Sequence, residues 1–248
     1  SAQLLGLSAT PGRTWNEPDA DRKLSEFFAT RKVTLKVDGY DNPVSYLINQ
    51  GYLAEPKFTQ IEIAANIALT SDEQDRIRET FELPSSVLDR LGDNDQRNLL
   101  IVHHAEQLLK RHSRVILFAA SVRQSDLLAA VLSARGHWAA SITSKSPNGR
   151  AESIAAFKDD ENRPKILCNF GVLTTGFDAP RTSAALIARP TLSLVLYSQM
   201  VGRAMRGKVA GGNETCEILT VVDTTLPGFD SVVDAFSNWE DVWSDKDD

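Results

Sequence analysis

Long apolar runs are missing from this 248-residue sequence, and cysteine and methionine are rare, with two of each. No run approaches the roughly 20 apolar residues of a membrane-spanning helix, and no signal-peptide pattern opens the chain. We therefore expect a cytoplasmic protein with no membrane partner. Cys168 and Cys216 lie far apart inside apolar stretches, which predicts free, buried thiols in a reducing compartment.

Two motifs that handle nucleotide phosphates and their metal are also absent. The sequence contains no G-x-x-x-x-G-K-[ST] loop to cradle phosphates and no Asp-Glu-x-[His/Asp] motif for Mg²⁺. Its four histidines, at 103, 104, 112 and 137, lack the spacing of zinc ligands. We therefore expect no metal site within this chain.

Negative charge is concentrated at one end of the chain. Residues 238–248 hold five acids and one lysine, a net charge of −4 out of the total of −6, so the other 237 residues carry only −2. Basic side chains could still form a local positive strip on the rest of the molecule; the candidates are Arg111, Arg114, Arg123, Lys145 and Arg150. A solvated surface of mixed charge is the alternative that composition alone favours.

Short apolar segments alternate with amphipathic ones along the chain, a pattern typical of a parallel sheet covered on both faces by helices. Strands are predicted at 4–10, 58–64, 115–119, 137–142, 165–170, 184–188 and 216–223, and helices at 21–28, 43–49, 71–81, 93–111, 121–134, 149–158 and 192–205. Residues 207–214 are predicted to form a flexible loop. Ligands of such sheets bind at the carboxyl ends of the strands, so we expect functional residues just after Phe118, Ile142, Phe170 and Ala188, or at the starts of helices nearby.

The most informative motif is Q-x-x-G-R-x-x-R in the run YSQMVGRAMRGK, formed by Gln199, Gly202, Arg203 and Arg206. On a helix, the spacing of three places both guanidiniums on one face. Two planar, multi-donor cations suit the oxygens of a phosphate chain. The alternative is an amphipathic helix with two surface arginines. Because an apolar strand comes just before, we expect the helix to start at the carboxyl edge of the sheet.

A second motif, ILCNFGVLTTGFDAP, covers residues 166–180. An apolar strand ends there, and Thr174, Thr175, Gly176 and Asp178 follow in a short segment. Hydroxyls and backbone amides in such a turn can hold a phosphate, and the Asp178 carboxylate can accept a hydrogen bond from a ribose hydroxyl. A plain Asx or Ser/Thr turn is the equally weighted alternative.

Three weaker motifs also follow apolar strands. LGLSATPGR includes Ser8 and Thr10 at a strand end, and Ser121 begins a helix whose N-terminus could bind phosphate or could simply be capped. The third, ITSKSPNGRAESIAAFKD, includes Ser144. Each is unspecific when taken alone.

Taken together and in order, these runs resemble the superfamily 2 helicases, particularly the branch with DEAD/DEAH-like translocases and type III restriction subunits. LSATP is similar to motif III, LFAAS to motif IV, GVLTTGFDAP to motif V and QMVGRAMR to motif VI, and NQGYLAEPKF is similar to the segment joining the two motor domains. The resemblance covers nearly the whole chain. It implies a RecA-like doubly wound parallel sheet in a three-layer sandwich, here the C-terminal motor domain.

The resemblance also assigns roles to residues. It implies that Arg203 and Arg206 are arginine fingers and that Gln199 orients the γ-phosphate or the attacking water. It places Gly176, Asp178 and Gly202 near ATP, and assigns strand contacts to Ser121, Arg123, Ser144, Thr174 and Thr175. Ser8 and Thr10 would couple the ATP state to the grip on the strand. ATP and Mg²⁺ would be bound mainly by a first RecA-like domain, which carries the P-loop in this family.

The expected organisation has three parts. Residues 1–55 would be the end of the first motor domain and a connector, residues 56–228 the RecA-like C-terminal domain, and residues 229–248 an acidic helix or tail. We expect the C-terminal motor domain of an ATP-dependent helicase or translocase, inactive alone, acting on DNA in preference to RNA. A nuclease or methyltransferase subunit is a further partner that the resemblance allows. The alternatives are a non-catalytic RecA-like adaptor and an unrelated doubly wound enzyme, such as a nucleotide-sugar transferase.

Overall fold

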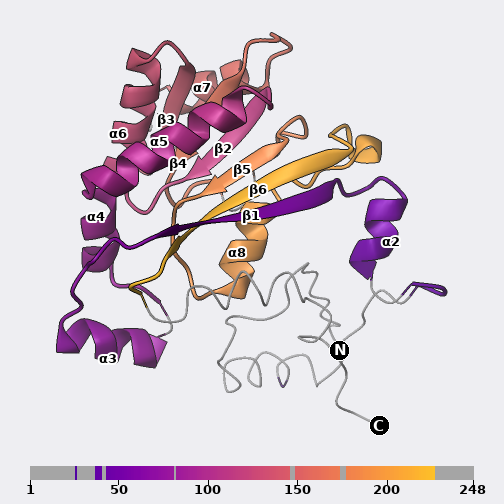
Figure 1. The fold of residues 1–248 in the computed structure, drawn as a ribbon. Coiled ribbons are helices and arrows are strands. Elements are labelled where there is room, and N and C mark those ends of the chain that lie inside the picture. Colours follow the sequence, from indigo (N-terminus) through magenta and orange to yellow (C-terminus); the bar gives the residue numbers. More distant parts are fainter. Residues whose placement is uncertain are drawn as a thin grey trace, which may run out of the picture.

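The computed structural model describes residues 26, 37–40, 43–80, 82–145, 149–173 and 177–226. Within them, six strands form one sheet in the order β1-β6-β5-β2-β4-β3, and every neighbouring pair is parallel. The strands are β1 (Glu55–Ile63), β2 (Arg114–Phe118), β3 (Trp138–Ile142), β4 (Lys165–Asn169), β5 (Ala184–Ile187) and β6 (Thr215–Asp223). The predicted α/β parallel sheet is therefore confirmed (Figure 1).

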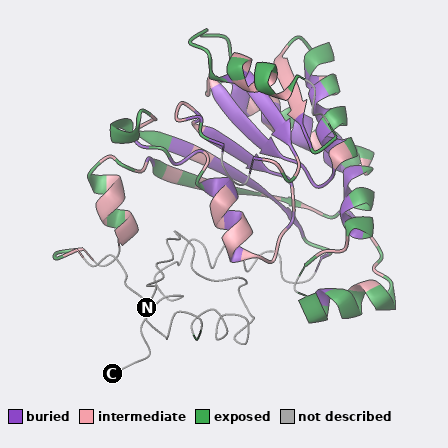
Figure 2. Ribbon diagram, turned by 180° about the vertical axis from the view of Figure 1, so that it is seen from behind, coloured by how far each residue is buried: buried purple, intermediate pink, exposed green. Residues whose placement is uncertain are grey.

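Helices cover both faces of this sheet (Figure 1). They are α2 (Pro43–Asn49), α3 (Ser71–Thr80), α4 (Ser85–Gly92), α5 (Asp95–Leu109), α6 (Val122–Ala134), α7 (Arg150–Lys158) and α8 (Leu194–Val201), with the short 3-10 helix η1 at Lys208–Ala210. Apolar residues of α5 and α6 pack on one face with Val115, Leu117 and Ile166, while those of α7 and α8 pack on the other with Ile116, Phe118 and Leu167. Successive residues of β2 thus point to opposite faces of the sheet, and both faces are buried, which explains why the strand is apolar at nearly every position (Figure 2).

Helix α4 was not predicted from the sequence. Its apolar residues Val87, Leu88 and Leu91 are buried with Ala65, Ala120 and Leu226, which lie far away along the chain. An eight-residue helix is too short to be stable alone. Tertiary packing at the carboxyl end of the sheet therefore stabilises it.

Several predicted features fall outside the described residues. These are the strand over 4–10 with Ser8 and Thr10, nearly all of the helix over 21–28, the segment Thr174–Gly176, and the acidic tail 229–248. Among the described residues, no helix is long and apolar enough to cross a membrane. Cys168 and Cys216 are free and buried, as predicted, and burial raises the pKa of each thiol to about 12.

Candidate functional site at the amino edge of the sheet

Helix α8 carries the chain from one edge of the sheet to the other. It begins after β5, at the carboxyl edge, where the Ser193 hydroxyl accepts a hydrogen bond from the Leu196 amide at 3.2 Å. It ends at Val201, and the next turn has tighter bonds, from the Arg203 amide to the Met200 carbonyl and from the Ala204 amide to the Val201 carbonyl. The arginine motif therefore lies beyond the helix.

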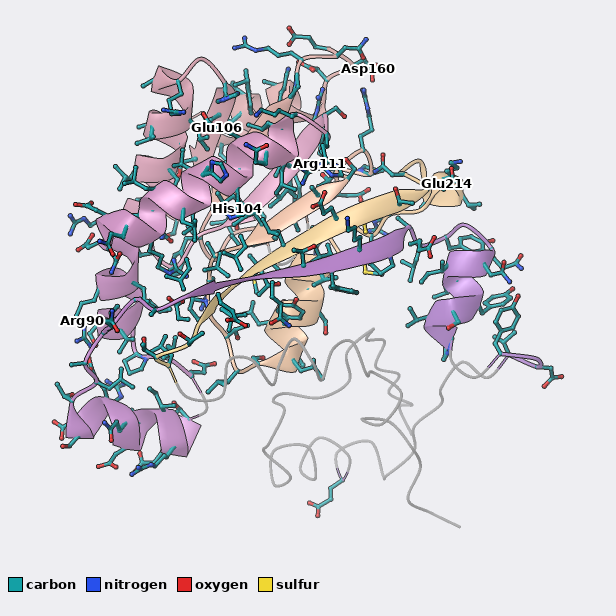
Figure 3. All side chains as sticks on the ribbon, viewed as in Figure 1. Arg90, His104, Glu106, Arg111, Asp160 and Glu214 are labelled. Atoms are coloured by element: carbon teal, nitrogen blue, oxygen red, sulfur yellow. The ribbon has the colours of Figure 1, made fainter. Side chains whose placement is uncertain are left out.

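The start of α8 at the carboxyl edge is as expected, but the expectation that both arginines share one face of this helix was wrong. They are not on one face of a helix, because α8 stops short of both. Both arginines lie at the amino edge of the sheet, because α8 carries the chain back to the level at which the strands begin. Arg206 forms a β-bridge with Leu53, just before β1. Its carbonyl accepts a hydrogen bond from the amide of Asn213, just before β6. In Figure 3, Glu214 marks this edge, and Arg90 on α4 lies at the far side of the sheet.

The segment after the arginines is fastened closely to the segment before β1. The amides of Ala54, Gly207 and Val209 donate to the carbonyls of Met205, Tyr52 and Gly51, each at 3.0 Å. A Cβ atom on Gly207 would lie 2.1 Å from the Gly51 oxygen, so only glycine fits here. Residues 207–214, predicted to be a flexible loop, thus form a hydrogen-bonded turn that contains η1.

Arg206 and Asp178 form an exposed pair at this edge. The Arg206 Nε and Asp178 Oδ1 atoms are 3.4 Å apart, and the side chains are 45% and 63% exposed. An ion pair in this setting contributes little to stability, so an incoming anion can replace the carboxylate at small cost. Arg206 is therefore placed as an accessible cation beside a hydrogen-bond acceptor.

Arg203 occupies a different environment from Arg206. Its guanidinium donates a hydrogen bond to the Phe177 carbonyl, in the segment that runs from β4 to β5. Burial lowers the pKa of Arg203, the charge of Arg206 lowers it further, and Asp178 opposes both effects. The structure thus brings together Arg203, Arg206 and Asp178, and gives Arg203 a link between two predicted motifs.

Gln199 and Gly202 complete the sequence motif. Gln199 is half-buried on the last part of α8, and Gly202 is exposed at the C-cap of that helix. Both lie within four residues of Arg203 along the chain.

Three of the five predicted strand contacts, Ser121, Arg123 and Ser144, lie at the opposite, carboxyl edge, and Thr174 and Thr175 fall outside the described residues. Ser121 follows β2 and is buried, and its hydroxyl accepts from the Gln124 amide at 3.1 Å, so the structure gives it the role of a helix cap. Arg123 is exposed and pairs with Asp93 at 3.1 Å. Ser144 is exposed just beyond β3.

The suggested positive strip does not include all of its candidates. Arg114 begins β2 at the amino edge, and its side chain is 1% exposed. Its guanidinium donates to the carbonyls of Asp159 and Glu161, each within 2.8 Å, beyond the C-terminus of α7. Arg114 is therefore a structural cation, and its two donors stabilise the negative end of that helix.

Sequence reasoning missed two residues of the carboxyl edge, Phe170 and Arg189. They come directly after β4 and directly after Ala188, where functional residues are expected at strand ends. Phe170 lies within the second motif but received no role there, and Arg189 lies outside the motifs. Their side chains meet, with the Arg189 guanidinium carbon 4.9 Å from the centre of the Phe170 ring.

No group of three or more metal-binding side chains occurs among the residues that the structure describes. A Mg²⁺ ion would find a single carboxylate, Asp178, in the amino-edge cluster, beside two cations. The donor set at this edge fits the phosphate oxygens of a nucleotide and does not fit a metal ion.

Comparison with known proteins identifies a family and several relatives. Residues 97–208 match the family described as "Helicase conserved C-terminal domain". The chain is 36% identical over 94 residues to a "51.5 kDa protein" of a Lactococcus phage (isolate 7-9), and 27% identical over 227 residues to "Putative ATP-dependent helicase IRC3" of Saccharomyces cerevisiae. These matches cover 38% and 91% of this chain, and it spans only 20% and 30% of the lengths of those relatives.

Among solved structures, the fold is similar to a fragment of "a putative HsdR subunit of a type I restriction enzyme" from Vibrio vulnificus YJ016. The TM-score is 0.55 at 20% identity, over 84% of this chain and 44% of that one. At this identity the likeness supports the fold alone. The family match and the helicase relative, joined to the parallel sheet, lead to one conclusion. The chain contains the C-terminal RecA-like domain of a superfamily 2 helicase.

Proposed function

We propose that this domain is the second half of an ATP-dependent motor that moves along nucleic acid. The observation that carries the proposal is the accessible Arg206 at the amino edge, held in place by the glycine-dependent contact with the segment before β1. A cation fixed by backbone hydrogen bonds is suited to act on a ligand bound by another domain, because little freedom is lost when the ligand arrives.

In this proposal Arg206 is the arginine finger. Such a group stabilises charge on the transferred phosphoryl group and contributes about 10³–10⁵ in rate in related enzymes. Arg203 would act mainly through position, because its side chain is half-buried and one of its five N–H donors already binds the Phe177 carbonyl. Asp178 and Gly202 would lie beside the nucleotide, with Gly176, and Gln199 would orient the γ-phosphate or the attacking water.

A complete nucleotide site needs parts that this sequence lacks. A P-loop lysine and magnesium ligands would come from a first RecA-like domain, placed against the amino edge. ATP would supply the phosphoanhydride bond whose hydrolysis changes the distance between the two domains, and Mg²⁺ would neutralise charge on its phosphates. We further propose that residues 1–55 belong to that first domain and a connector, residues 56–228 to this domain, and residues 229–248 to a tail.

The carboxyl edge would hold the nucleic acid. Five residues of β2, at about 3.3 Å each, separate the two edges by about 17 Å, so a bound strand and a bound nucleotide would not compete for one surface. Arg123, Ser144, Thr174 and Thr175 would contact strand phosphates, which position nucleic acid without reading its sequence. Ser121 would act there through its helix cap, and Ser8 and Thr10 would couple the two edges. DNA is the substrate that we favour.

Arg206→Ala tests this proposal in a protein that joins this chain to its P-loop domain. We expect ATP turnover to fall by at least about 10³, while binding to single-stranded oligonucleotides stays within twofold. Lys208→Ala is the matched control, because it removes an exposed cation two residues away that, among the residues that the structure describes, pairs only with Glu214. The chain alone should show negligible turnover.

A non-catalytic adaptor predicts a different result. In that case the joined protein would not hydrolyse ATP at all, and Arg206→Ala would change nothing. Turnover that survives Arg206→Ala would refute the finger assignment, and robust turnover by the chain alone would refute the need for a second domain.

A further inference from the structure

One cation at the carboxyl edge, Arg189, is held by an aromatic ring and, within the described part of the chain, by no hydrogen-bond acceptor. The Arg189 guanidinium lies over the Phe170 ring at 4.9 Å, and it makes no hydrogen bond or ion pair with the residues that the structure describes. Its side chain is half-buried, yet none of its nitrogens is among the buried polar atoms without a partner. All five N–H donors of this side chain therefore remain available to a ligand.

The contact bridges two strands that are not neighbours. Phe118 of β2 aligns with both Asn169 of β4 and Ile187 of β5, so β2 lies between the strands that lead to Phe170 and Arg189. With strands about 4.8 Å apart, the two backbones are separated by about 10 Å. The residues that continue β2 here, Ala119 and Ala120, are small and buried, which leaves room for a long side chain to cross the strand end.

The base of Arg189 is firmly anchored. The preceding residue, Ala188, accepts a hydrogen bond at 2.6 Å from Arg97, which is fully buried and paired with Asp223 at 3.1 Å. With the backbone held on one side and the ring beneath the guanidinium on the other, the cation has little freedom to lose on binding.

Charge at this position favours an anionic ligand. Burial lowers the pKa of Arg189 from its ordinary value, and the acid that acts on it is Glu82, whose charge raises that pKa. Glu82 acts on Arg189 through its charge alone, since no ion pair joins the two in the described part of the chain. An arginine pKa starts so high that the side chain stays charged at neutral pH.

We propose that Arg189, presented by Phe170, is a contact for single-stranded nucleic acid, with its guanidinium gripping one phosphate through paired N–H donors. The proposal rests on the proposed function, because it needs a strand at the carboxyl edge. Proteins that bind single strands without sequence preference commonly combine basic side chains with aromatic rings. A guanidinium stacked on a ring keeps its planar fork pointing outward, which matches the geometry of phosphate oxygens.

Arg189→Met tests the contact in the 248-residue chain, with fluorescence anisotropy of oligothymidylate and of oligouridylate as the two ligands. We expect affinity to fall about tenfold, and the slope of log affinity against log salt to decrease by about 0.7, the value for one phosphate contact on a single strand. Arg189→Lys should keep the slope and lose a smaller part of the affinity, because it retains the charge without the fork. Phe170→Leu should weaken binding while keeping the charge.

Arg181→Met is the matched control, since it removes a cation three residues before β5, at the opposite edge. Thermal unfolding of every variant checks that it folds. If Arg189→Met does not fold, the affinity of Arg189→Lys tests the contact instead. An unchanged affinity and slope in Arg189→Met would overturn this inference alone, as would an equal loss in Arg181→Met. If the wild-type chain binds neither oligonucleotide, the proposed strand site at the carboxyl edge fails as well. A loss confined to one ligand would assign the contact to DNA or to RNA.

Discussion

Replacing Gly207 with alanine should break the contact that places Arg206. The backbone at Gly207 has φ −81° and ψ 170°, which any residue can adopt, so no conformational strain complicates the result. The cost arises from the added methyl group, which would lie 2.1 Å from the Gly51 oxygen and 2.6 Å from the Tyr52 carbonyl carbon. Ordinary contact begins near 3.4 Å, so the two backbone segments must separate by more than 1 Å.

The magnitude follows from what that separation breaks. The hydrogen bonds from Gly207 to Tyr52 and from Val209 to Gly51 join the segments at 3.0 Å each, and a typical bond contributes about 0.5–1.5 kcal/mol. Forcing a methyl group into a packed site costs about 1–3 kcal/mol more. We therefore expect the free energy of unfolding to fall by about 3 kcal/mol.

Urea unfolding followed by circular dichroism measures this loss. Gly211→Ala is the control within the same turn, because its nearest neighbour would be a Pro180 carbon at 3.9 Å and its cost comes from φ +77° alone. We expect that control to lose about 1 kcal/mol. In a protein that carries the P-loop domain, Gly207→Ala should also slow ATP turnover with little effect on strand binding. A loss below about 0.5 kcal/mol in Gly207→Ala would show that the close approach does not hold this turn.

The other predictions concern the core and an exposed helix. Arg97→Met should cost about 3–5 kcal/mol in urea unfolding, because Asp223 is left buried without its cation; the double variant with Asp223→Leu should recover most of that loss, and no recovery would argue against a direct coupling. A hydrogen bond from the Ser86 hydroxyl is the main cause that lowers the pKa of Glu73 from 4.5 to about 2, so the ionised Glu73 stabilises the fold fully above about pH 4.5 and ceases to do so as the pH falls toward 2. Glu73→Gln should therefore reduce the change in the free energy of unfolding across that pH window, and an unchanged pH dependence would contradict this. Cys168 and Cys216 have pKa values raised to about 12 by burial, so iodoacetamide should modify them only after urea unfolds the chain, and labelling of the native protein at pH 8 would refute their burial.

Helix boundaries show how far local patterns reach. The prediction of α2 agrees residue for residue with the structure, because Pro43 opens it and the chain turns at Gly51. The end of α8 was misplaced by four residues, since the pattern Gly202-Arg203 does not reveal that the next residues bond to the segment before β1. The sequence predicts a helix boundary when the residues that end the helix are local, and it does not when they are distant along the chain.

The candidate site shows the same division. Two separate motifs name Arg203 and Arg206 on one side and Asp178 on the other, and the structure brings these three residues together. Their edge of the sheet could not be read from the motif, because it depends on the length of α8 and on the strands beside which that helix ends. Arg189 and Phe170 were not singled out, because their contact crosses a strand that neither belongs to.

Hydrophobic alternation and motif order along the chain by themselves determined the parallel α/β fold and the helicase family, because both depend on which residues follow one another. Only the tertiary structure decided that the arginine motif and the strand-end cations lie at opposite edges of one sheet. The physical reason is that parallel strands place all their starts at one edge and all their ends at the other. A side chain in a connecting segment therefore lies at the edge of the sheet where that segment leaves or enters a strand.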